Sequence, residues 1–576
     1  MKDRVSNDIG TKEPQLRWAD IPWKSIQKRV KNLRQRIYRA TQQQQWNRVR
    51  SLMKLMLRSQ ANLLLSIKRV TQINPGKRTA GIDGLTFRST EEREWLWHKM
   101  QEYTPWVAKP ARRVYIPKAN GRQRPLGIPT VQDRVLQAVV KNALEPSWEA
   151  RFEVNSFGFR PGRSVHDAIT QCHSRLRKGH DLWVLDADIK GAFDHISHDY
   201  ILNAIGEIPG RALIKQWLKA GYIEANVFHE TFSGVPQGGV ISPLLANIAL
   251  DGMGAMLSTY LKVKVKGFSP NAKTKGTYKQ KLPRFGYIRY ADDFVVTAET
   301  QEDLEAIVPV IRAWLQERGL ELNEEKTQIV QVSKGFNFLG FTIRQFNGHC
   351  IIRPQKDKVL AFINDIRAWL KRHTNIKQED VIRYLNPKLK GWCNYYRFVA
   401  SKRVFSYVED QIWKALWKWS CRRHRHKSKR WIAKKYFKTL NGQSWIFATT
   451  AQERDGKEHT FALTQVYNTP ITRHIRVKGT SSPDDPTLSD YWRKRQTGMG
   501  KVLLAPGSKL YHLAQNQRWK CQVCSEHLFN GETLQTHHKQ SVKDGGRDDL
   551  LNLELVHKAC HNHRHAYGRR LEPDDG

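Results

Sequence analysis

The alternation of apolar and polar positions predicts a β-hairpin over residues 285–297 that carries two acids at its tip. Residues 285–290 alternate and are rich in aromatic side chains, and residues 294–297 are β-formers. Asp292 and Asp293 fall in the turn between these strands. Neighbouring carboxylates repel each other, so a fold tolerates them best beside a cation. An exposed Asp-Asp turn without a ligand is the alternative that this stretch alone leaves open.

A second apolar run, residues 182–189, predicts a buried strand that ends in acids, Asp186 and Asp188 among them. One carboxylate from a strand end and two from a hairpin tip are the ligands that a two-metal phosphoryl-transfer site requires, with the ions about 3.5–4 Å apart. A site whose ligands are all oxygen atoms favours Mg²⁺ over zinc. The two patterns together predict a nucleotidyl transferase.

Residues 113–129 predict another hairpin, which turns at Asn120-Gly121 and carries Lys118 and Arg124 on its two arms. Such a hairpin can fold over a triphosphate and neutralise its β and γ groups. A solvated basic hairpin is the alternative.

Apolar residues at helical spacing predict an α-rich scaffold around these strands. Residues 23–70 predict a basic, amphipathic helix pair that packs on the next domain, although its Lys/Arg face could instead hold template RNA. The lysine-rich residues 262–281 are typical of a flexible basic insertion. Further helical periodicity covers residues 131–180, 199–222, 242–257, 302–318 and 355–425.

The net charge of the chain indicates what kind of partner it binds. The 576 residues carry a formal net charge of +43, so we expect a polyanionic partner, with nucleic acid ahead of an anionic membrane surface. The sequence has no run of 18 apolar residues and no signal-peptide core at its start. We therefore expect a soluble protein in the cytoplasm of a bacterial cell or in an organelle, without a membrane partner.

The C-terminal region has the spacing of a metal site. Two pairs, Cys521 with Cys524 and His557 with Cys560, predict a tetrahedral Cys₃His zinc site that would staple a fold too small for a good core. The other four of the seven cysteines are scattered and read as buried thiols. Further polar candidates lie between and just after the two pairs: His537, His538, Asn552, His561 and His565.

The motifs of residues 60–345 resemble, in their order, the fingers and palm of reverse transcriptases, in the version found in group II intron-encoded proteins. The resemblance implies that Asp188, Asp292 and Asp293 are the catalytic acids that bind two Mg²⁺ ions. It implies that Lys118 and Arg124 contact the triphosphate of an incoming dNTP and that Gln237 lines its site. Phe193, five residues after Asp188, would exclude a 2′-hydroxyl and so select deoxynucleotides. Asp186 is an extra acid to which we assign a secondary role.

The resemblance continues more weakly past the palm. Residues 346–430 would form an α-helical thumb, also called the maturase or X domain, which grips intron RNA and aids its splicing. Residues 401–440 hold 13 Lys/Arg against two acids, with tryptophans interleaved, and this composition suits contact with phosphates and bases. The aromatic residues of 386–398 are better explained by packing within a helical bundle. Residues 431–508 correspond to the family's DNA-binding region.

The C-terminal pattern resembles the HNH, or ββα-metal, nuclease. That family implies His538 as general base, Asn552 orienting it, and one Mg²⁺ or similar ion held by His537, His561 and His565. Gln535 departs from the family, which has an acid there, and leaves activity and metal geometry open. His557 replaces a more usual cysteine, and His563 could compete as a ligand. A zinc-stapled DNA-binding knob without cleavage is the alternative.

The resemblance therefore implies an α+β multidomain protein that copies RNA into DNA, assists splicing and nicks target DNA to prime that synthesis. Its partners would be group II intron RNA, target DNA and dNTPs, with monomer and homodimer both open. A splicing cofactor without polymerase use, or the reverse transcriptase of another retroelement, are the alternatives. The expected divisions are a basic helical extension (1–75), fingers and palm (76–345), thumb (346–430), DNA-binding region (431–508) and HNH domain (509–576).

Overall fold

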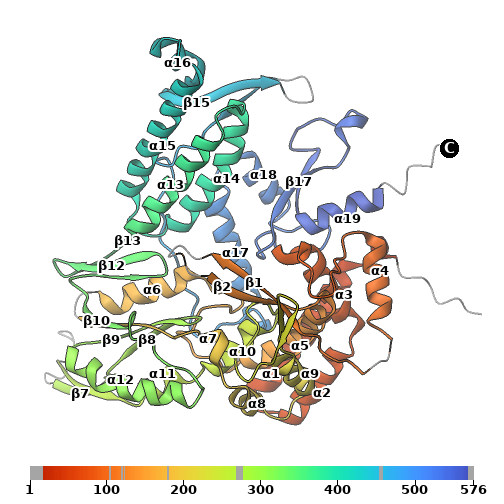
Figure 1. Cartoon of the computed structure of the whole chain (residues 1–576), viewed down its shortest axis with the longest axis vertical. Coiled ribbons are helices and arrows are strands. Elements are labelled where there is room, and N and C mark those ends of the chain that lie inside the picture. The colour runs from red at the N-terminus through yellow and green to blue at the C-terminus, as the bar shows by residue number, and fades with distance from the viewer. Residues whose placement is uncertain are drawn as a thin grey trace, which may run out of the picture.

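The computed structural model describes residues 17–102, 105–117, 121, 123–177, 181–267, 277–452 and 458–568. It is a mixed α+β structure in which helices surround several small sheets. Figure 1 shows the N-terminal helices on one side, a sheet layer on the other, and the helices α13–α16 standing above that sheet layer. Within the described residues, no helix is both long and apolar enough to cross a bilayer.

The central sheet has the strand order β10-β3-β9-β8, and all its pairs are antiparallel. Alternation along β3 explains why it is buried on both faces: Val184 joins one apolar core, and Leu185 and Ala187 join another. The expected acidic strand and hairpin are therefore present. Their bounds are β3 (Trp183–Asp188), β8 (Gly286–Tyr290), β9 (Asp293–Ala298) and β10 (Gln328–Gln331).

Two helices cover this sheet from opposite sides. Helix α6 (Val165–Leu176) packs in the core that contains Val184, and α12 (Gln301–Gln316) packs in the core that contains Leu185. Both helices begin with a side-chain cap, supplied by Ser164 and Thr300. The sheet is thus a rigid platform for whatever its strand ends carry.

The expected basic hairpin is also present. Its strands β1 (Ala111–Pro117) and β2 (Gln123–Ile128) pair from Arg112 opposite Ile128 to Pro117 opposite Gln123. They form a four-stranded sheet with β4 (Tyr222–Glu224) and β5 (Val227–His229). Arg124 lies on β2, whereas Lys118 lies outside the described residues.

Three N-terminal helices, rather than the expected pair, pack against the long helix α5 (Val131–Glu149). Val30, Ile37 and Met53 belong to the same core as the central-sheet residues Leu185 and Ala187. This packing supports the structural interpretation of their periodicity. The helices are α1 (Trp23–Gln42), α2 (Trp46–Leu57) and α3 (Gln60–Lys68), followed by α4 (Thr90–Lys99).

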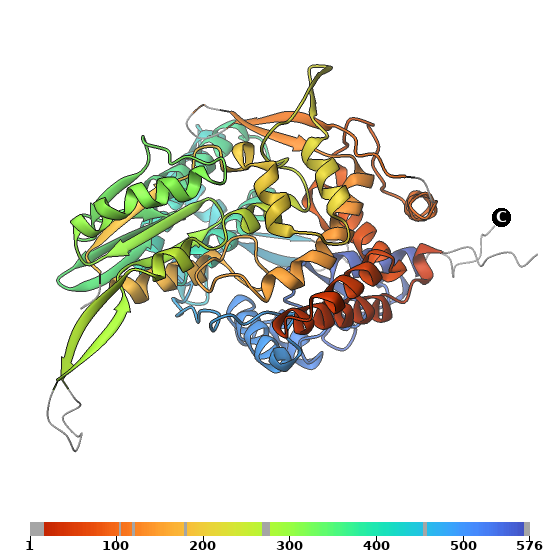
Figure 2. The same cartoon turned by 90° about the horizontal axis from the view of Figure 1, so that it is seen from below.

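Glycines break two of the expected helices. Gly206, Gly210 and Gly252 have φ of 65°, 90° and 100°, a conformation that ends a right-handed helix and that glycine adopts at little cost. The products are α8 (His198–Ile205), α9 (Arg211–Lys219), α10 (Ser242–Ala249) and α11 (Met253–Ser258). The lysine-rich insertion that follows is paired as β6 (Leu261–Gly267) and β7 (Thr277–Pro283), which project from the body in Figure 2.

The upper helices, α13–α16, share one core with the strands that follow them. Phe405 and Trp419 pack in the same cluster as Phe437 and Phe447, so the core does not break at the expected boundary after residue 430. The elements are β11 (Phe336–Phe338), β12 (Phe341–Phe346), β13 (His349–Pro354), α13 (Lys356–Arg372), α14 (Gln378–Tyr396), α15 (Lys402–Arg423), α16 (Lys429–Tyr436), β14 (Phe437–Leu440), β15 (Gln443–Gln452) and β16 (Glu458–Ala462).

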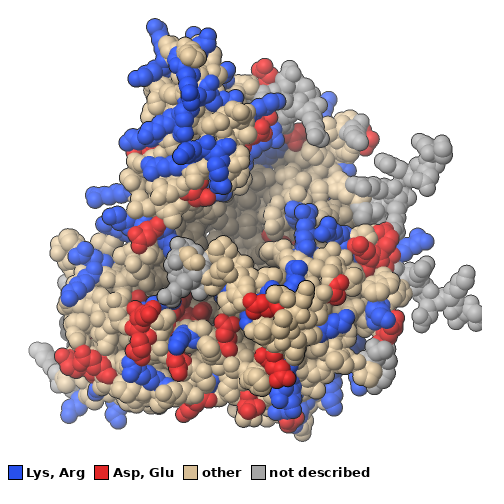
Figure 3. Space-filling view, in the orientation of Figure 1, with Lys and Arg blue, Asp and Glu red and all other residues tan. Residues whose placement is uncertain are grey.

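Most aromatic side chains of the upper helices are used in packing. Trp392 stacks on Phe362 with ring centroids 5.0 Å apart, as the helical-bundle interpretation expects. Trp419 is fully buried, whereas Trp431 is 38% exposed. Lys and Arg cover the outer surface over α15 and α16, beside a hollow in the face shown in Figure 3. Contact with a polyanion would therefore depend on charge more than on stacking.

Residues 463–488 form a strap that crosses the body without long regular elements. It is held by Asp167, whose Oδ1 accepts hydrogen bonds from the His474 ring (3.0 Å), the Val477 N–H (2.8 Å) and the Arg495 guanidinium (2.9 Å). Arg495 lies on α17 (Ser489–Leu503), just beyond the strap. Burial alone would raise the pKa of Asp167, but the hydrogen bond and charge of His474, with Arg495, lower it to about 2.

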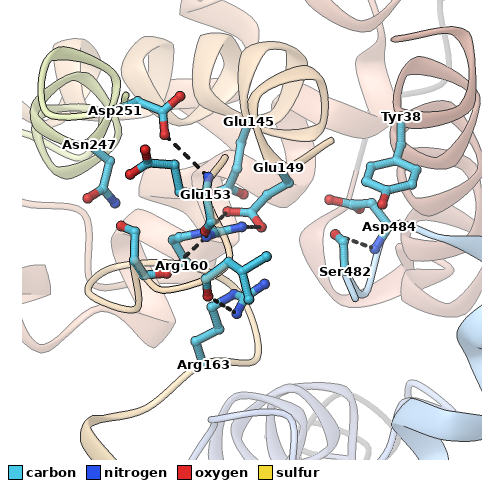
Figure 4. Close-up of polar contacts among 12 residues, drawn as sticks. Tyr38, Glu145, Glu149, Glu153, Arg160, Arg163, Asn247, Asp251, Ser482 and Asp484 are labelled. Atoms are coloured by element: carbon cyan, nitrogen blue, oxygen red, sulfur yellow. Dashed lines mark hydrogen bonds and ion pairs between the residues drawn. The ribbon is translucent and has the colours of Figure 1, made fainter. Parts of the chain in front are cut away.

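A second buried contact ties the strap to α1. Arg34 binds both carboxylate oxygens of Asp484 at 2.7 and 2.8 Å and also reaches Glu145 at 2.9 Å. Figure 4 shows Asp484 beside Tyr38 of α1, and the buried pair of Arg160 and Glu149 nearby. Residues 479–489, whose Pro, Gly, Ser and Asp content is typical of a linker, are therefore a fixed part of the body.

The C-terminal unit has its own apolar core around Leu513, Leu528 and Val556. Helix α18 (Lys509–Asn516) comes first in the chain. Strands β17 (Leu534–His538) and β18 (Leu553–His557) then pair antiparallel, and α19 (Lys558–Gly568) packs on both strands. The order strand, strand, helix is the one expected here.

We predict that Asp167→Asn lowers the free energy of unfolding by about 3–5 kcal/mol, because it removes the charge that pairs with the Arg495 guanidinium and replaces one of two accepting oxygens by a donor. The lowered pKa gives the sign of the pH dependence. The contribution is fully present above about pH 4, the ordinary pKa of aspartate, and is lost as pH falls towards 2. Chemical denaturation of both proteins between pH 7 and 2 measures the difference.

Asp365→Asn is the matched control, because Asp365 is exposed and pairs only with Lys388 on the surface. We expect it to cost less than about 1 kcal/mol. Equal destabilisation by the two substitutions would contradict a special role for Asp167.

Candidate active sites

The antiparallel register places two of the three expected acids directly opposite each other. Asp188, at the end of β3, pairs with Asp293, at the start of β9. The carboxylate of Asp188 accepts hydrogen bonds from the Lys326 ammonium at 2.6 Å and from the Asn323 amide at 3.2 Å. Lys326 thus supplies a positive charge at the place where a metal cation is expected.

The acids at this sheet end hold their protons more tightly than usual. Loss of solvent around Asp293, together with the charges of Asp292 and Asp188, raises its pKa to about 7. Desolvation, reinforced by Asp188, also raises the pKa of Asp292, and the same two causes raise that of Asp186 to about 6. Such crowding of carboxylates is relieved by a divalent cation.

A buried platform fixes the turn that carries Asp292. Ala291 has φ of 59°, an uncommon conformation for a residue with a Cβ. Its carbonyl accepts a hydrogen bond from the Arg289 guanidinium at 3.1 Å, and the same nitrogen binds the Asn247 side chain at 3.0 Å. Asn247 in turn donates to the Gly158 carbonyl at 2.8 Å. These contacts hold the turn in one conformation.

Gly158 is part of this platform because nothing larger fits. A Cβ at this position would lie 2.2 Å from the Ala291 nitrogen. The loop around Gly158 also hydrogen-bonds the strand itself, through Phe157 N–H to the Arg289 carbonyl at 2.9 Å. The loop that contains Phe157 and Gly158 therefore supports the acidic turn.

Three of the four expected nucleotide-contacting residues lie near the acids. Arg124 donates to the Gln237 side chain at 2.8 Å, and Gln237 donates to Asp194 at 3.2 Å. Phe193 is nearly buried and meets the Phe159 ring edge-on, with centroids 6.2 Å apart. The fourth residue, Lys118, is the one outside the described part of the chain.

The expected zinc ligands are brought together and buried. One ligand atom from each of Cys521, Cys524, His557 and Cys560 lies within 4.8 Å of all the others. His557 points its Nδ1 at the Cys524 sulfur, 3.4 Å away, while its Nε2 lies 3.2 Å from the His527 and Leu528 carbonyls. Hydrogen bonds from Cys524 and Cys560 lower the pKa of Cys521, which favours a thiolate.

His537, His561 and His565 form a second cluster, with ligand atoms again within 4.8 Å of one another. His561 and His565 are four residues apart on α19 and therefore share one face. Burial, aided by the charge of Arg564, lowers the pKa of His537 to about 4. The imidazole is thus neutral and available as a ligand at pH 7. Within the described residues this cluster and the Cys₃His set are the two such groups, and the three aspartates do not form a third.

His538 lies on the opposite face of β17 from His537, because side chains alternate along a strand. Its Nε2 is 3.3 Å from the Asp548 carboxylate. Asn552, expected to orient His538, binds backbone instead: its amide donates to the Gln540 and Arg547 carbonyls at 3.0 and 2.8 Å. The structure corrects that expectation, since Asn552 shapes the loop and Asp548 is the partner of His538.

Glu554 is an acid on the same face of the two strands as Gln535. It pairs with His537 across the strands, so it faces α19, and it forms an ion pair with Arg564. Gln535 shares this face, and its side-chain oxygen is buried without a hydrogen-bond partner among the described residues. His563 is not part of the cluster. Its Nδ1 lies 3.4 Å from the Trp23 indole nitrogen.

Sequence reasoning missed Lys326, Arg289 and Asp548. Arg289 lies three residues before Asp292. A charged residue in an otherwise apolar strand was a signal that could have found it. Lys326 and Asp548 come from loops distant in sequence from their partners, and the spacing of motifs carries no sign of such contacts.

Family profiles cover most of the chain. Residues 116–343 match reverse transcriptase (RNA-dependent DNA polymerase), and residues 18–100 match the N-terminal domain of reverse transcriptase. Residues 359–437 match the maturase-specific domain of group II introns, and residues 521–567 match HNH endonuclease.

Curated proteins show the same relationship. Protein YkfC of Escherichia coli is 37% identical over 322 residues, which cover 51% of this chain and 82% of that protein. Group II intron-encoded protein LtrA of Lactococcus lactis is 31% identical over 413 residues, covering 58% of this chain and 68% of that protein. A putative COX1/OXI3 intron 2 protein of Saccharomyces cerevisiae is 28% identical over 332 residues, with 50% and 38% covered.

The acids at the sheet end and the adjoining profiles define a reverse transcriptase joined to an HNH endonuclease. With its maturase-specific domain and its relatives, the chain belongs to the group II intron-encoded reverse transcriptase–maturases that carry a C-terminal HNH domain.

We predict that Gly158→Ala abolishes most primer extension, because the new methyl group displaces the Ala291 backbone and with it Asp292. The overpacking should also cost about 1–3 kcal/mol of stability. Steady-state extension and thermal unfolding of the purified chain measure the two effects.

Gly391→Ala is the control, since Gly391 lies inside helix α14 and a Cβ there meets nothing within 4 Å. It should keep full activity and gain up to about 1 kcal/mol from higher helix propensity. Normal extension by Gly158→Ala would show that the turn does not depend on this platform.

Proposed function

We propose that Asp188, Asp292 and Asp293 are the catalytic acids of the polymerase, in a palm formed by the central sheet. The observation that carries this proposal is the pairing of Asp188 with Asp293 beside a turn that a buried arginine holds in place. Three carboxylates gathered at one end of the sheet offer the oxygen ligands that Mg²⁺ prefers. When bound, two such ions would stabilise negative charge on the reacting phosphate and the leaving pyrophosphate.

The chain's own residues then position the reactants. The 3′-hydroxyl of the primer attacks the α-phosphate of a dNTP, a new phosphodiester forms, and pyrophosphate leaves. Arg124 binds the triphosphate, and Gln237 orients Arg124 through their 2.8 Å hydrogen bond. Phe193, supported by Phe159, blocks the space of a 2′-hydroxyl. Lys118 keeps its expected role as a triphosphate contact.

The upper helices would act as the thumb and maturase surface for intron RNA. Their basic exterior over α15 and α16 supports this proposal (Figure 3), because phosphate contacts release counterions and dominate affinity. Tryptophans that are buried in the core cannot stack on bases, so we assign recognition to shape and charge. The five domain divisions expected from the sequence remain proposals, amended by the common core of α13–α16 and β14–β16.

The C-terminal unit would nick target DNA from a zinc-stapled ββα fold. We assign His538 as general base with Asp548 as its positioning partner, supported by their 3.3 Å separation. The His537, His561 and His565 cluster holds the catalytic ion. Three imidazoles and no carboxylate favour a divalent transition metal over the Mg²⁺ expected from the sequence. When bound, the ion would stabilise charge on the scissile phosphate.

The two activities fit one sequence of events on target DNA. Intron RNA held by the protein inserts into one DNA strand, and the nuclease nicks the other. The 3′-hydroxyl that the nick exposes then primes synthesis on the RNA. A splicing cofactor without polymerase use is less well supported, because the chain retains all three acids and the platform beneath them.

We predict that the full chain extends a primer on an RNA template with dNTPs and Mg²⁺. Asp292→Ala should reduce extension by at least about 10²–10³-fold, the scale on which one preorganised electrostatic group matters. Phe193→Val should keep dNTP extension and raise incorporation of rNTPs, because it opens space for the 2′-hydroxyl. Phe346→Val, an exposed ring on β12, is the control. Unchanged sugar selectivity in Phe193→Val would contradict the gate.

We predict that His538→Ala reduces DNA nicking by about 10²–10⁴-fold, the usual contribution of a general base, while primer extension is unchanged. Nicking of a labelled target by the chain assembled with its intron RNA is the assay. His512→Ala, an exposed histidine on α18, should nick normally. If His538→Ala still nicks at the wild-type rate, water is activated elsewhere.

A further inference from the structure

The N-terminal domain and the nuclease helix α19 together enclose a cavity of about 380 Å³. From the N-terminal side, Lys77, Arg78, Arg88 and Arg93 line it, and from α19, Asn562 and His563. No carboxylate is among the described residues that form its wall. Cationic side chains gathered at one wall repel one another, and Glu92 beside Arg88 and Arg93 offsets only part of their charge, so the cavity suits an anion.

This repulsion is seen in the pKa of Lys77. Desolvation, together with the charges of Lys558, Arg78 and Arg93, lowers the pKa of Lys77. Arg93 is committed to structure, since its guanidinium donates to the Thr71 hydroxyl and to the Ser89 and Arg88 carbonyls. Arg78 and Arg88 are exposed, and neither guanidinium has a hydrogen bond or ion pair with another described residue. These two side chains are free to bind a ligand.

Two neutral donors line the same cavity. Trp18 is 1% exposed, and its indole N–H has no acceptor among the described residues. His563 uses Nδ1 to accept from the Trp23 indole, which places its ring proton on Nε2. An unpaired buried donor is costly, and an anionic oxygen would satisfy it.

The position of the cavity on α19 indicates which anion it takes. His563 is two residues from both His561 and His565, so it projects from the other side of the helix. A group in the cavity is therefore separated from the metal-binding histidines by about one helix diameter, ~10–12 Å.

We infer that this cavity binds a backbone phosphate of the target DNA, near the nick but not at the cleaved bond, and seats the strand in the nuclease. The inference rests on the proposed nicking of DNA by the C-terminal unit. It also gives a reason for the contact between the two domains: the reverse transcriptase domain supplies the cations, and the nuclease supplies the other wall.

The test compares the wild-type chain with the double variant Arg78→Gln/Arg88→Gln in equilibrium binding to a target DNA duplex across a salt series. We expect weaker binding and a slope of log K against log salt that is smaller by about 0.9 per lost contact, up to about 1.8. Binding of intron RNA should be unchanged. Lys54→Gln/Lys334→Gln removes two exposed cations outside the cavity and is the charge-matched control.

A phosphate scan then locates the contact. Single neutral methylphosphonates are placed along the nicked strand, and nicking by the wild-type chain assembled with its intron RNA is measured at each position. A methylphosphonate at one position near the nick, but not at the cleaved bond, should weaken nicking by the wild type and should not weaken nicking by the double variant further. Competition with inorganic phosphate distinguishes a DNA contact from a site for free phosphate.

The outcomes separate this inference from the proposed nuclease. Absence of nicking by the wild type would contradict the nuclease assignment and leave the binding result to be judged alone. Normal nicking with equal DNA binding by the double variant and the wild type would overturn the cavity. Equal losses for DNA and intron RNA, or full competition by inorganic phosphate at low concentration, would also overturn the assignment to DNA.

Discussion

The proposed polymerase site depends on an arrangement that is electrostatically unfavourable by itself, the direct opposition of Asp188 and Asp293 across an antiparallel pair. Like charges facing each other weaken a sheet, so the surrounding structure must hold the strands in register. Apolar faces on both sides of β3 supply part of that constraint. The Arg289 guanidinium supplies the rest by holding the Ala291 carbonyl, while Lys326 offsets charge at Asp188. A site held in this way is poised to bind cations without rearranging the sheet.

The second organising feature is the return of the chain's C-terminal third to its N-terminal helices. The strap is held on the body by the hydrogen bond between His474 and Asp167 and by two ion pairs, Asp167 with Arg495 and Arg34 with Asp484. Buried charges are costly unless each partner is present. These contacts therefore fix the path of the strap across the body. The strap leads to the nuclease, which packs on the face formed by Trp18 and Trp23. Polymerase and nuclease are thereby parts of one body.

The net charge of +43 has a structural consequence as well as a functional one. Self-repulsion of this size opposes a compact fold, and a polyanion that binds the folded state relieves it. The charge is not spread evenly over the visible face, because Lys and Arg gather over α15 and α16 beside the hollow (Figure 3). A basic wall also lies between the two domains at α19. A bound nucleic acid would therefore stabilise the folded protein.

The sequence by itself determined the local features that short-range physics controls. These include the acidic hairpin, the β1–β2 hairpin, the helical periodicity, and the cysteine–histidine spacing that gathers into two metal clusters. It did not predict the roles of Arg289, Lys326 or Asp548, and it misplaced Asn552, because these depend on contacts between segments far apart in the chain. It also suggested a linker where the strap is fixed by buried ion pairs. Tertiary structure alone decides such matters, since charge pairing acts through space and leaves no periodic pattern along the chain.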